Sequence, residues 1–563
     1  MINAASTVQG KTSTMLSPFA QEVPQQEETS DLETQARIRL TTNMELVENR
    51  AVKIKTRLAD KILDAIPRSK LLGRLPNTDI DEVLVYWGVD EVRALHTLGF
   101  KNAPPAPLRN YAWTGVYTPM SHQKTTAEFL AAYDRCFILS EMGTGKTCSA
   151  AWAADFLMKR GEVHRVLVVC PISIMHAAWK EDLFRSVMHR KVAIAHGNKA
   201  QRIKVINSGA EFVIINYDGI EIVLDEIMAG GFDLIIVDEA NNLKTTSTRR
   251  WKAFHKLMTT LNPRLWMMTG TPAAQSPEDA FGLAKLVCPE RVPKYFTQWR
   301  DMVMQKITMY KWIPRPRSRD IVFNALQPAI RFTKEQCLDL PDIMYARRDV
   351  ELTPQQNHYY KAMIAQMLLS AAGEEVSAVN AAAKLNKLLQ ISCGAVYADS
   401  GEVLRFDASN RLAVMDEIID ESPKKTIVFA PFRHTIELIK DHLAGRGIHT
   451  TFIHGDVSPA KRGEIIKDFQ ENPDTKVIVI QPQAASHGIT LTAASSVIWF
   501  GPTSSVDTYL QANARAHRKG QDTKVTIFML QGSPAEQRMY DMLDKRIDSH
   551  EDLISLYKEV LQS

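Results

Sequence analysis

A glycine-rich turn between an apolar strand and a helix constrains the fold of this chain more than any other feature. The segment EMGTGKT (141–147) follows the apolar run CFIL (136–139), and a strand–turn–helix unit of this kind is typical of a parallel α/β sheet. Its backbone N–H groups are predicted to face phosphate oxygens. Lys146 is expected to reach the β- and γ-phosphates of ATP, and the Thr147 hydroxyl to bind Mg²⁺. Ser140 replaces the first glycine of the strict P-loop pattern.

A second apolar strand, DLIIVDEA (233–240), ends in two acidic residues. We expect Asp238 to hold Mg²⁺ through water and Glu239 to polarise the attacking water. Two such strands in this order make a chance glycine turn improbable. The predicted nucleotide-binding residues of the loop are Met142, Gly143, Thr144, Gly145, Lys146 and Thr147.

Short apolar segments alternate with helical segments from about residue 106, which predicts parallel α/β architecture. The first half contains strand candidates at 136–139, 166–170, 212–216, 234–238 and 265–270. The second half repeats the plan at 426–430, 449–454, 476–480, 496–500 and 525–530. The expected fold class is therefore α/β, with two RecA-like parallel-sheet lobes, helical insertions and a small N-terminal extension.

Two arginines near the end of the second half fit this two-lobe interpretation. Arg515 and Arg518 lie three residues apart in QANARAHRKGQ (511–521). They are predicted to act as arginine fingers at the γ-phosphate when the lobes close, and such fingers increase rates by about 10³–10⁵-fold in phosphoryl transfer. The competing interpretation is a solvated helix face, which the accompanying motifs make improbable.

The composition is that of an ordinary globular protein, and the net charge of +4 points to no general affinity for nucleic acid. The six cysteines show no C-x-x-C spacing, which predicts a reducing compartment and no structural zinc. No apolar run approaches the roughly 20 residues of a membrane span. We therefore expect a cytoplasmic protein without membrane contact, a nuclear location being the alternative.

The sequence divides into four expected regions. Apolar residues at helical spacing between Val47 and Ile66, interleaved with Lys and Arg, predict a basic amphipathic helix within residues 36–75. This helix is expected either to touch DNA or a protein partner, or to pack on the rest of the chain. The expected regions are a disordered tail at 1–35, a helical accessory region at 36–105 within a possible partner-binding segment 1–105, a first lobe at 106–335, and a second lobe at 336–563 with a helical insertion at 355–400.

Taken together, the motifs resemble those of superfamily 2 helicases and, within them, the SWI/SNF-type DNA translocases. The resemblance runs from His122 to Gln521, and its most specific part is ARAHRKGQ (514–521). It implies a DNA-dependent ATPase that acts on double-stranded or branched DNA, with Gln123 reading adenine and with Thr269 and Thr271 linking the ATP site to the DNA track. The other matching segments are SHQ (121–123), CPISIMHAAW (170–179), INYDG (215–219), MTGTPAAQSPEDAFGL (268–283), RFTKEQCLDLPD (331–342) and FIHGDVSPAKR (452–462).

The chain departs from the family pattern at two places. Asn241 stands at the fourth position of the acidic motif, and Ser486-His487-Gly488 stands where relatives commonly show a glycine pair. The absence of a reader domain makes it more similar to compact bacterial or phage members, or to fork-remodelling members.

Contacts to nucleic acid are expected to fall mainly on phosphates, because a translocase must tolerate any sequence. Hydroxyls at strand ends also commonly cap helices, which is the competing role for these residues. KWIPRPRSRD (311–320) is either a DNA-gripping loop or a solvated surface excursion. The candidate contacts are Ser173, Asn216, Thr271, His454, Thr490 and Thr492.

Three functions remain open at this point. The first is an ATP-driven translocase on DNA, the second a strand-separating helicase acting on forks or RNA, and the third a clamp that binds ATP without hydrolysing it. The residues Lys146, Asp238 and Glu239 together with both arginines favour hydrolysis.

Overall fold

The computed structural model describes residues 44–545, apart from 271–272, 274–275, 309–311, 338–340, 372–377, 398–402, 486–488 and 519. The predicted disordered tail at 1–35 lies outside the described residues. The chain forms two compact units, Met1–Pro104 and Pro105–Ser563.

The N-terminal unit is a four-stranded antiparallel sheet of order β1-β2-β4-β3 with two short helices. The predicted helix within 36–75 is wrong for the described residues, where only Ala59–Ala65 is helical. Val52, Ile54 and Thr56 are buried and alternate with partly exposed lysines, which is the period of a strand. The elements are β1 (Met44–Val47), β2 (Ala51–Thr56), α2 (Ala59–Ala65), β3 (Ser69–Arg74), β4 (Asp81–Tyr86) and α3 (Val89–Thr97).

The first sheet of the C-terminal unit has seven parallel strands in the order β13-β5-β10-β9-β6-β8-β7. All five predicted strands of the first half are confirmed, while β7 and β13 escaped prediction. The strands are β5 (Arg135–Ile138), β6 (Val166–Val169), β7 (Val192–Ala195), β8 (Phe212–Ile215), β9 (Leu234–Asp238), β10 (Arg264–Met268) and β13 (Ala329–Ile330). The helices are α4 (Ser121–Ala132), α5 (Lys146–Lys159), α6 (Glu181–Ser186), α7 (Lys199–Ile206), α8 (Tyr217–Ile222), α9 (Leu224–Ala229), α10 (Arg249–Leu261), α11 (Ala280–Val287), α12 (Phe296–Val303) and α13 (Ser318–Ala325).

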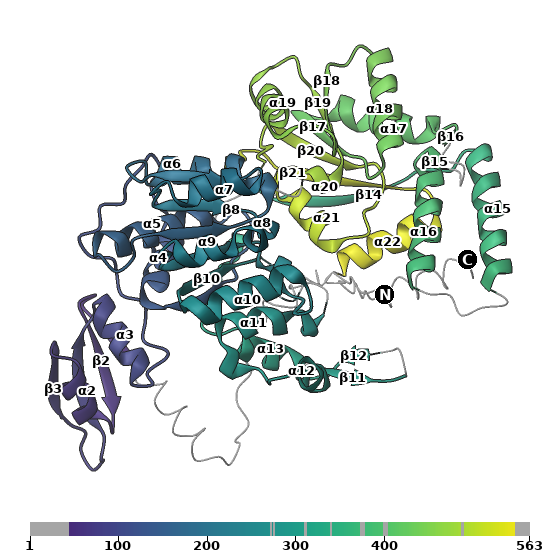
Figure 1. The fold of residues 1–563 in the computed structure, drawn as a ribbon. Coiled ribbons are helices and arrows are strands. Elements are labelled where there is room, and N and C mark those ends of the chain that lie inside the picture. Colours follow the sequence, from purple (N-terminus) through teal and green to yellow (C-terminus); the bar gives the residue numbers. More distant parts are fainter. Residues whose placement is uncertain are drawn as a thin grey trace, which may run out of the picture. The chain divides into compact units, whose positions relative to one another are not determined.

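The second sheet has six parallel strands in the order β14-β21-β20-β17-β19-β18 (Figure 1). The five predicted strands are again confirmed, and β14 is the addition. The strands are β14 (Ile343–Asp349), β17 (Lys425–Phe429), β18 (Thr450–Ile453), β19 (Val477–Ile480), β20 (Ala494–Trp499) and β21 (Val525–Gln531). The helices are α14 (Lys334–Cys337), α17 (Ser409–Glu421), α18 (Arg433–Gly445), α19 (Pro459–Glu471), α20 (Pro482–Ala485), α21 (Val506–Asn513) and α22 (Pro534–Asp544).

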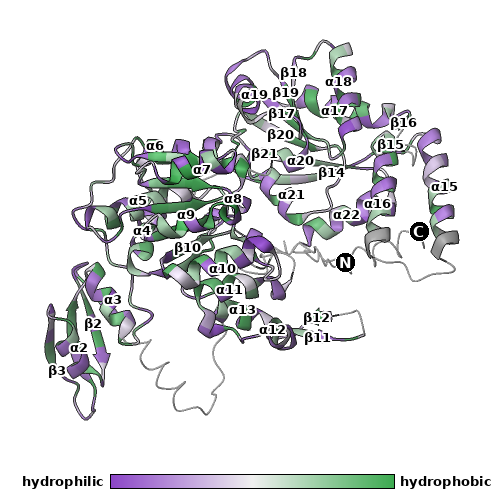
Figure 2. Ribbon diagram, viewed as in Figure 1, coloured by the Kyte–Doolittle hydropathy of each residue, from purple (hydrophilic) through white to green (hydrophobic). Residues whose placement is uncertain are grey.

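Both sheets are buried along whole strands. Every residue of β6, β8, β19 and β20 is buried, because helices cover both faces of a parallel sheet. Figure 2 shows the resulting contrast between hydrophobic strands and helices with hydrophilic outer faces. The predicted fold of two RecA-like α/β lobes is therefore confirmed.

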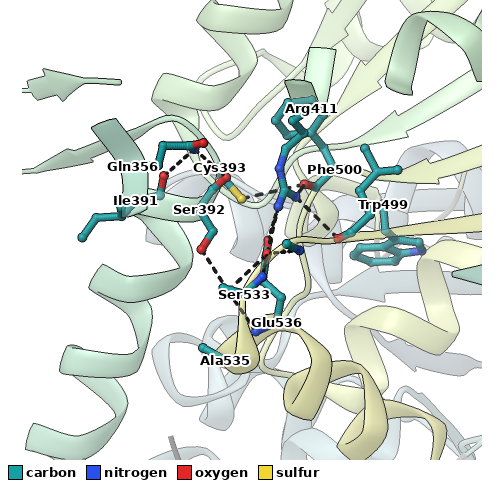
Figure 3. A network of polar contacts seen from close by, with 12 residues as sticks. Gln356, Ile391, Ser392, Cys393, Arg411, Trp499, Phe500, Ser533, Ala535 and Glu536 are labelled. Atoms are coloured by element: carbon teal, nitrogen blue, oxygen red, sulfur yellow. Dashed lines mark hydrogen bonds and ion pairs between the residues drawn. The ribbon is translucent and has the colours of Figure 1, made fainter. Parts of the chain in front are cut away.

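A helical insertion follows β14 and is joined to the second lobe by a buried polar network. Arg411 and Glu536 form an ion pair of 2.8 Å and are 1% and 0% exposed. The Ser392 hydroxyl donates to the Ser533 hydroxyl at 3.0 Å, which ties the end of α16 to the start of α22 (Figure 3). The insertion consists of α15 (Pro354–Ala371), α16 (Ala378–Ser392), β15 (Ala395–Tyr397) and β16 (Val403–Arg405).

Candidate nucleotide site

The glycine-rich loop joins the carboxyl end of β5 to the first turn of α5. Gly143 and Gly145 have φ angles of 85° and 77°, in the left-handed region that favours glycine. A Cβ atom at Gly145 would lie 1.9 Å from Gln123 Nε2, so a larger residue would collide there. The backbone of the loop therefore passes close to the Gln123 side chain. The loop leads into the N-terminus of α5, whose free backbone N–H groups can bind phosphate.

Lys146 is held by its own loop. Its Nζ donates to the carbonyl oxygens of Ser140 at 2.8 Å and Glu141 at 3.1 Å. Desolvation lowers the pKa of the lysine, against the attraction of Glu239 and Asp238. A cation surrounded by carbonyls and carboxylates in this way is suited to exchange them for phosphate oxygens.

Two residues at the start of α4 contact the backbone of the glycine-rich loop. His122 Nε2 lies 2.8 Å from the Thr144 carbonyl oxygen, and Gln123 Nε2 donates to the same atom at 3.4 Å. The Met120 N–H donates to Gln123 Oε1 at 3.0 Å. The structure therefore places Gln123 directly against the phosphate loop, and its predicted contact with adenine stays a prediction.

The acidic motif stands at the carboxyl end of β9, next to β10 and one strand away from β5. Asp238 Oδ2 accepts a hydrogen bond from Trp179 Nε1 at 2.9 Å, and Oδ1 accepts one from the Glu239 N–H at 3.0 Å. The Tyr217 hydroxyl donates to the Glu239 carbonyl oxygen at 3.0 Å. Glu239 has a φ of 54°, a conformation that costs energy for a non-glycine residue and is common at functional sites.

The electrostatics of the two acids differ from those of surface carboxylates. Burial and the charge of Asp238 together raise the pKa of Glu239 to about 7, against the attraction of Lys146. Burial also raises the pKa of Asp238. A carboxyl group that titrates near neutrality is suited to accept a proton from water.

The two predicted arginine fingers reach the same place from the second lobe. Arg515 is 9% exposed; burial and the neighbouring Arg518 lower its pKa to about 10, against the attraction of Glu239. Arg518 Nη1 donates to the Ile489 carbonyl oxygen at 3.0 Å. The Arg518 Cβ is 3.6 Å from the position of a Cβ atom at Gly143. The sheet edges of both lobes thus meet at one cluster of charges.

The segment RFTKEQCLDLPD (331–342), which the sequence singled out, connects this cluster to the second lobe through partners that the sequence did not reveal. The Ser140 hydroxyl accepts the Phe332 N–H at 3.0 Å, and Glu141 Oε2 accepts the Lys334 N–H at 3.2 Å. Lys334 Nζ then donates to the His517 carbonyl oxygen at 3.3 Å. Burial lowers the pKa of Lys334 to about 8, against the attraction of Glu141. Ser140, which replaces the first glycine of the strict P-loop pattern, thus binds the backbone of Phe332 through its hydroxyl group.

Comparison with protein-family models gives two matches. The SNF2-related domain matches residues 122–393, and the helicase conserved C-terminal domain matches residues 410–520. The chain belongs to the SNF2/helicase family of ATPases. The two models place the boundary between the halves of this SNF2 protein within the helical insertion that precedes β17.

Several curated proteins are similar to this SNF2 chain. Mouse chromodomain-helicase-DNA-binding protein 1-like is 25% identical over 423 residues, covering 70% of this chain and 45% of the relative. Mouse DNA annealing helicase and endonuclease ZRANB3 is 26% identical over 500 residues, covering 83% and 45%. The chain thus spans about half the length of these relatives. Putative protein p41 of Acyrthosiphon pisum secondary endosymbiont phage 1 is 24% identical over 405 residues, covering 68% and 85%.

A solved structure, the Sulfolobus solfataricus SWI2/SNF2 ATPase core in complex with dsDNA, matches with a TM-score of 0.40 and 22% identity. The match covers 77% of this chain and 92% of that one.

The candidate nucleic-acid contacts of this SNF2 chain fall into two sets. Ser173 and Asn216 follow the carboxyl ends of the adjacent strands β6 and β8, and His454 follows β18. Asn216 is 5% exposed, and its Oδ1 accepts from Arg202 Nη1 at 2.9 Å, so its amide oxygen is already engaged inside the lobe.

Two of the remaining candidates do not stand at the carboxyl end of a strand. Thr490 and Thr492 lie in the crossover that leads to the start of β20. The Thr492 hydroxyl accepts from Gln470 Nε2 at 3.2 Å. Thr271 and Ser486-His487-Gly488 lie outside the described residues.

The departure at Asn241 has a partner in the first lobe. The Thr269 hydroxyl donates to Asn241 Oδ1 at 3.2 Å. The acidic motif on β9 is thereby connected to the segment after β10, on the side where the resemblance implied a link to the DNA track.

Two searches of the described residues complete the picture of the site. No group of three or more His, Cys, Asp or Glu side chains there is arranged to hold a metal ion. In the same residues no helix combines the length and apolar character that a membrane crossing needs.

Proposed function

We propose that this chain hydrolyses ATP and uses the energy to move along double-stranded or branched DNA. The observation that carries the proposal is the single charge cluster to which both lobes contribute. Glu239 of the first lobe and Arg515 of the second attract each other there, and Lys146 shares the same surroundings. An arginine supplied from a second lobe makes hydrolysis depend on lobe closure.

Each residue of the cluster has a chemical task in this proposal. Lys146 exchanges the carbonyls of Ser140 and Glu141 for phosphate oxygens. Glu239, with a pKa near 7, orients the attacking water and accepts its proton. Arg515 and Arg518 stabilise the negative charge that develops in the transition state.

Thr147 at the start of α5 and Asp238 at the end of β9 are oxygen donors of the kind that Mg²⁺ takes. We propose that they hold this ion, which supplies charge neutralisation at the phosphates when bound. Magnesium commonly keeps several water ligands, so two protein oxygens are sufficient for such a site.

DNA as the track is supported by the family and by the names of its members. The mouse relatives are named a DNA-binding protein and a DNA annealing helicase. We propose that Ser173, His454 and Thr490, together with the other predicted contacts, touch phosphates rather than bases. A protein partner for the N-terminal region also remains a proposal.

Steady-state ATPase rates with no nucleic acid, duplex, single-stranded and forked DNA, and RNA test the proposal. We expect the duplex to give the largest stimulation, weakening steeply between two salt concentrations because phosphate contacts release counterions. Stimulation by forks or single strands alone would favour a strand-separating helicase. A rate that stays flat on every substrate would overturn the motor.

The variant Glu239→Gln separates hydrolysis from binding. We expect the rate constant for turnover to fall by about 10²–10⁴-fold, because a proton acceptor is lost. The Kd of ATP, measured by titration with a fluorescent analogue, should stay within about threefold. Unchanged turnover would contradict the role of Glu239, whereas lost ATP binding would show that Glu239 holds the nucleotide site together rather than acting on water.

A further inference from the structure

One stretch of the first lobe carries a local charge larger than that of the entire chain. Residues 302–319 contain five Lys and Arg residues and no Asp or Glu, whereas the whole chain has a net charge of +4. They form a hairpin of β11 (Met304–Lys306) and β12 (Trp312–Pro314), followed by the start of α13. We propose that the described part of this stretch, here called the basic arm, is a second DNA-binding site that holds backbone phosphates.

The basic arm is firmly attached at its base. The Arg315 N–H donates to the Val303 carbonyl oxygen at 2.9 Å, and Arg315 Nε donates to the carbonyl oxygens of Asp301 at 2.9 Å and Met304 at 3.0 Å. Met304 is 6% exposed and belongs to the core of the lobe. The strands therefore leave the lobe in a defined direction, and Figure 1 shows them extending beyond α12 and α13.

The two strands of the arm present different chemistry on their two faces. Trp312 packs against the lobe core, and the guanidinium of Arg300 lies over its ring at 5.3 Å. Ile313, the next residue, points the other way and is 37% exposed, and Ile307 is 51% exposed. The arm thus has one face fixed to the protein and one face directed to solvent.

The basic arm carries exposed positive charges, and these favour phosphate as its ligand. Lys306, Arg317 and Arg319 are exposed, and the sequence has no Asp or Glu between Asp301 and Asp320. Exposed cations on a hairpin with a fixed base attract the DNA backbone irrespective of base sequence. Exposed isoleucines beside them can contact sugars, whereas a dimer or protein contact would favour a broader apolar surface with fewer charges.

This arm is separate from the strand-end candidates of the proposed DNA track, and it lies at a distance along the chain from the charge cluster. The inference rests on the proposed function, because the DNA bound by the arm is the DNA on which the motor moves. It adds a grip on the first lobe that the family motifs do not include.

The test compares the full-length wild type with Lys306→Ala/Arg317→Ala and with the matched control Lys252→Ala/Lys256→Ala on α10. Both control lysines are exposed on the same lobe, so the net charge changes equally. Affinity for a 30-base-pair duplex (about three turns of DNA) is measured by fluorescence anisotropy between about 50 and 200 mM salt.

We expect the arm variant to lose about tenfold in affinity and its slope of log K against log salt to decrease by about 1.8, or 0.9 for each phosphate contact. The DNA-free ATPase rate should be unchanged, and the control should match the wild type. Equal losses in both variants would overturn the inference in favour of a general charge effect.

Unchanged affinity of the arm variant, with a wild type that DNA still stimulates, would overturn the arm alone. It would leave Ile307 and Ile313 as a contact for another protein. A wild type that neither binds DNA nor responds to it would instead contradict the proposed function, so the two failures are distinguishable.

Discussion

Two buried arginines of the second lobe have opposite electrostatic surroundings. Arg411 is buried beside Glu536; burial alone would lower its pKa, but the attraction of Glu536 outweighs burial and raises it (Figure 3). Arg515 is buried beside Arg518, and its pKa falls to about 10. The first arginine is satisfied within the folded lobe, whereas the second is held where additional negative charge would be stabilised.

This contrast separates a residue that holds the fold from one that is prepared for a ligand. Removing one partner of a buried ion pair leaves an uncompensated charge and destabilises a protein strongly. Removing a cation that faces another cation relieves repulsion, and its loss is felt when the anionic ligand is present. The variants below should therefore separate stability from activity.

The largest effect is expected for Arg515→Ala. We expect the ATPase rate to fall by about 10³–10⁵-fold, the range for loss of an arginine finger. The free energy of unfolding should change less than it does for Arg411→Ala, because repulsion from Arg518 offsets part of the attraction of Glu239. ATPase assays and urea denaturation check both values. A large loss of stability with intact turnover would reverse the comparison.

The reciprocal variant is Arg411→Ala. We expect it to lower the free energy of unfolding by about 3–5 kcal/mol, because Glu536 keeps a buried charge without its ion-pair partner. The ATPase rate per folded molecule should stay within about threefold. The double variant Arg411→Met/Glu536→Leu should regain much of the stability; a double variant as unstable as the single one would contradict this explanation.

A pH series tests the strained acid of the charge cluster. Because burial raises the pKa of Glu239 from 4.5 to about 7, the folded state binds this proton more tightly than the unfolded state does. Stability should therefore fall as the pH rises from about 4.5 to 7, by on the order of 1–3 kcal/mol. In the folded enzyme kcat/KM should rise around pH 7, where the carboxylate forms. Glu239→Gln should lack this stability change.

The smallest effect is expected for Lys334→Met. The lysine joins the phosphate loop to the His517 carbonyl oxygen, so we expect about a tenfold fall in kcat with a smaller change in KM. Lys334→Arg should restore part of the rate, because the positive charge and a donor remain. Equal effects of both variants on protein stability instead of rate would assign Lys334 a purely structural role.

Much of the site was predictable because its chemistry is carried by short contiguous motifs. The loop around Lys146 and the strand ending at Asp238 and Glu239 each contain a strand and its functional residues in one segment. In a parallel sheet the carboxyl ends share one edge, which is why the two motifs lie close together. The strand predictions around them are confirmed for the same reason.

Predictions from the sequence failed where the apolar spacing fits both a helix and a strand, or where a residue's partner lies far away along the chain. Around Val52 and Ile54 the apolar spacing permits both a helix and a strand, and pairing with β4 decides for the strand. Trp179, Tyr217 and Lys334 fall within recognised motifs, but no local pattern states that they bind Asp238, Glu239 or the carbonyl of His517.

By itself the sequence determined the class of fold, the two lobes and the position of the glycine-rich loop, because these depend on local periodicity and on residues a few positions apart. Only the tertiary structure decided that Arg411 pairs with a carboxylate whereas Arg515 lies beside another arginine. It also decided that hydrogen bonds of Arg315 hold the base of the basic arm. Burial and the charges of neighbouring side chains set those properties, and for Arg411 the neighbour is Glu536, 125 residues away. Such neighbours exist only once the chain has folded.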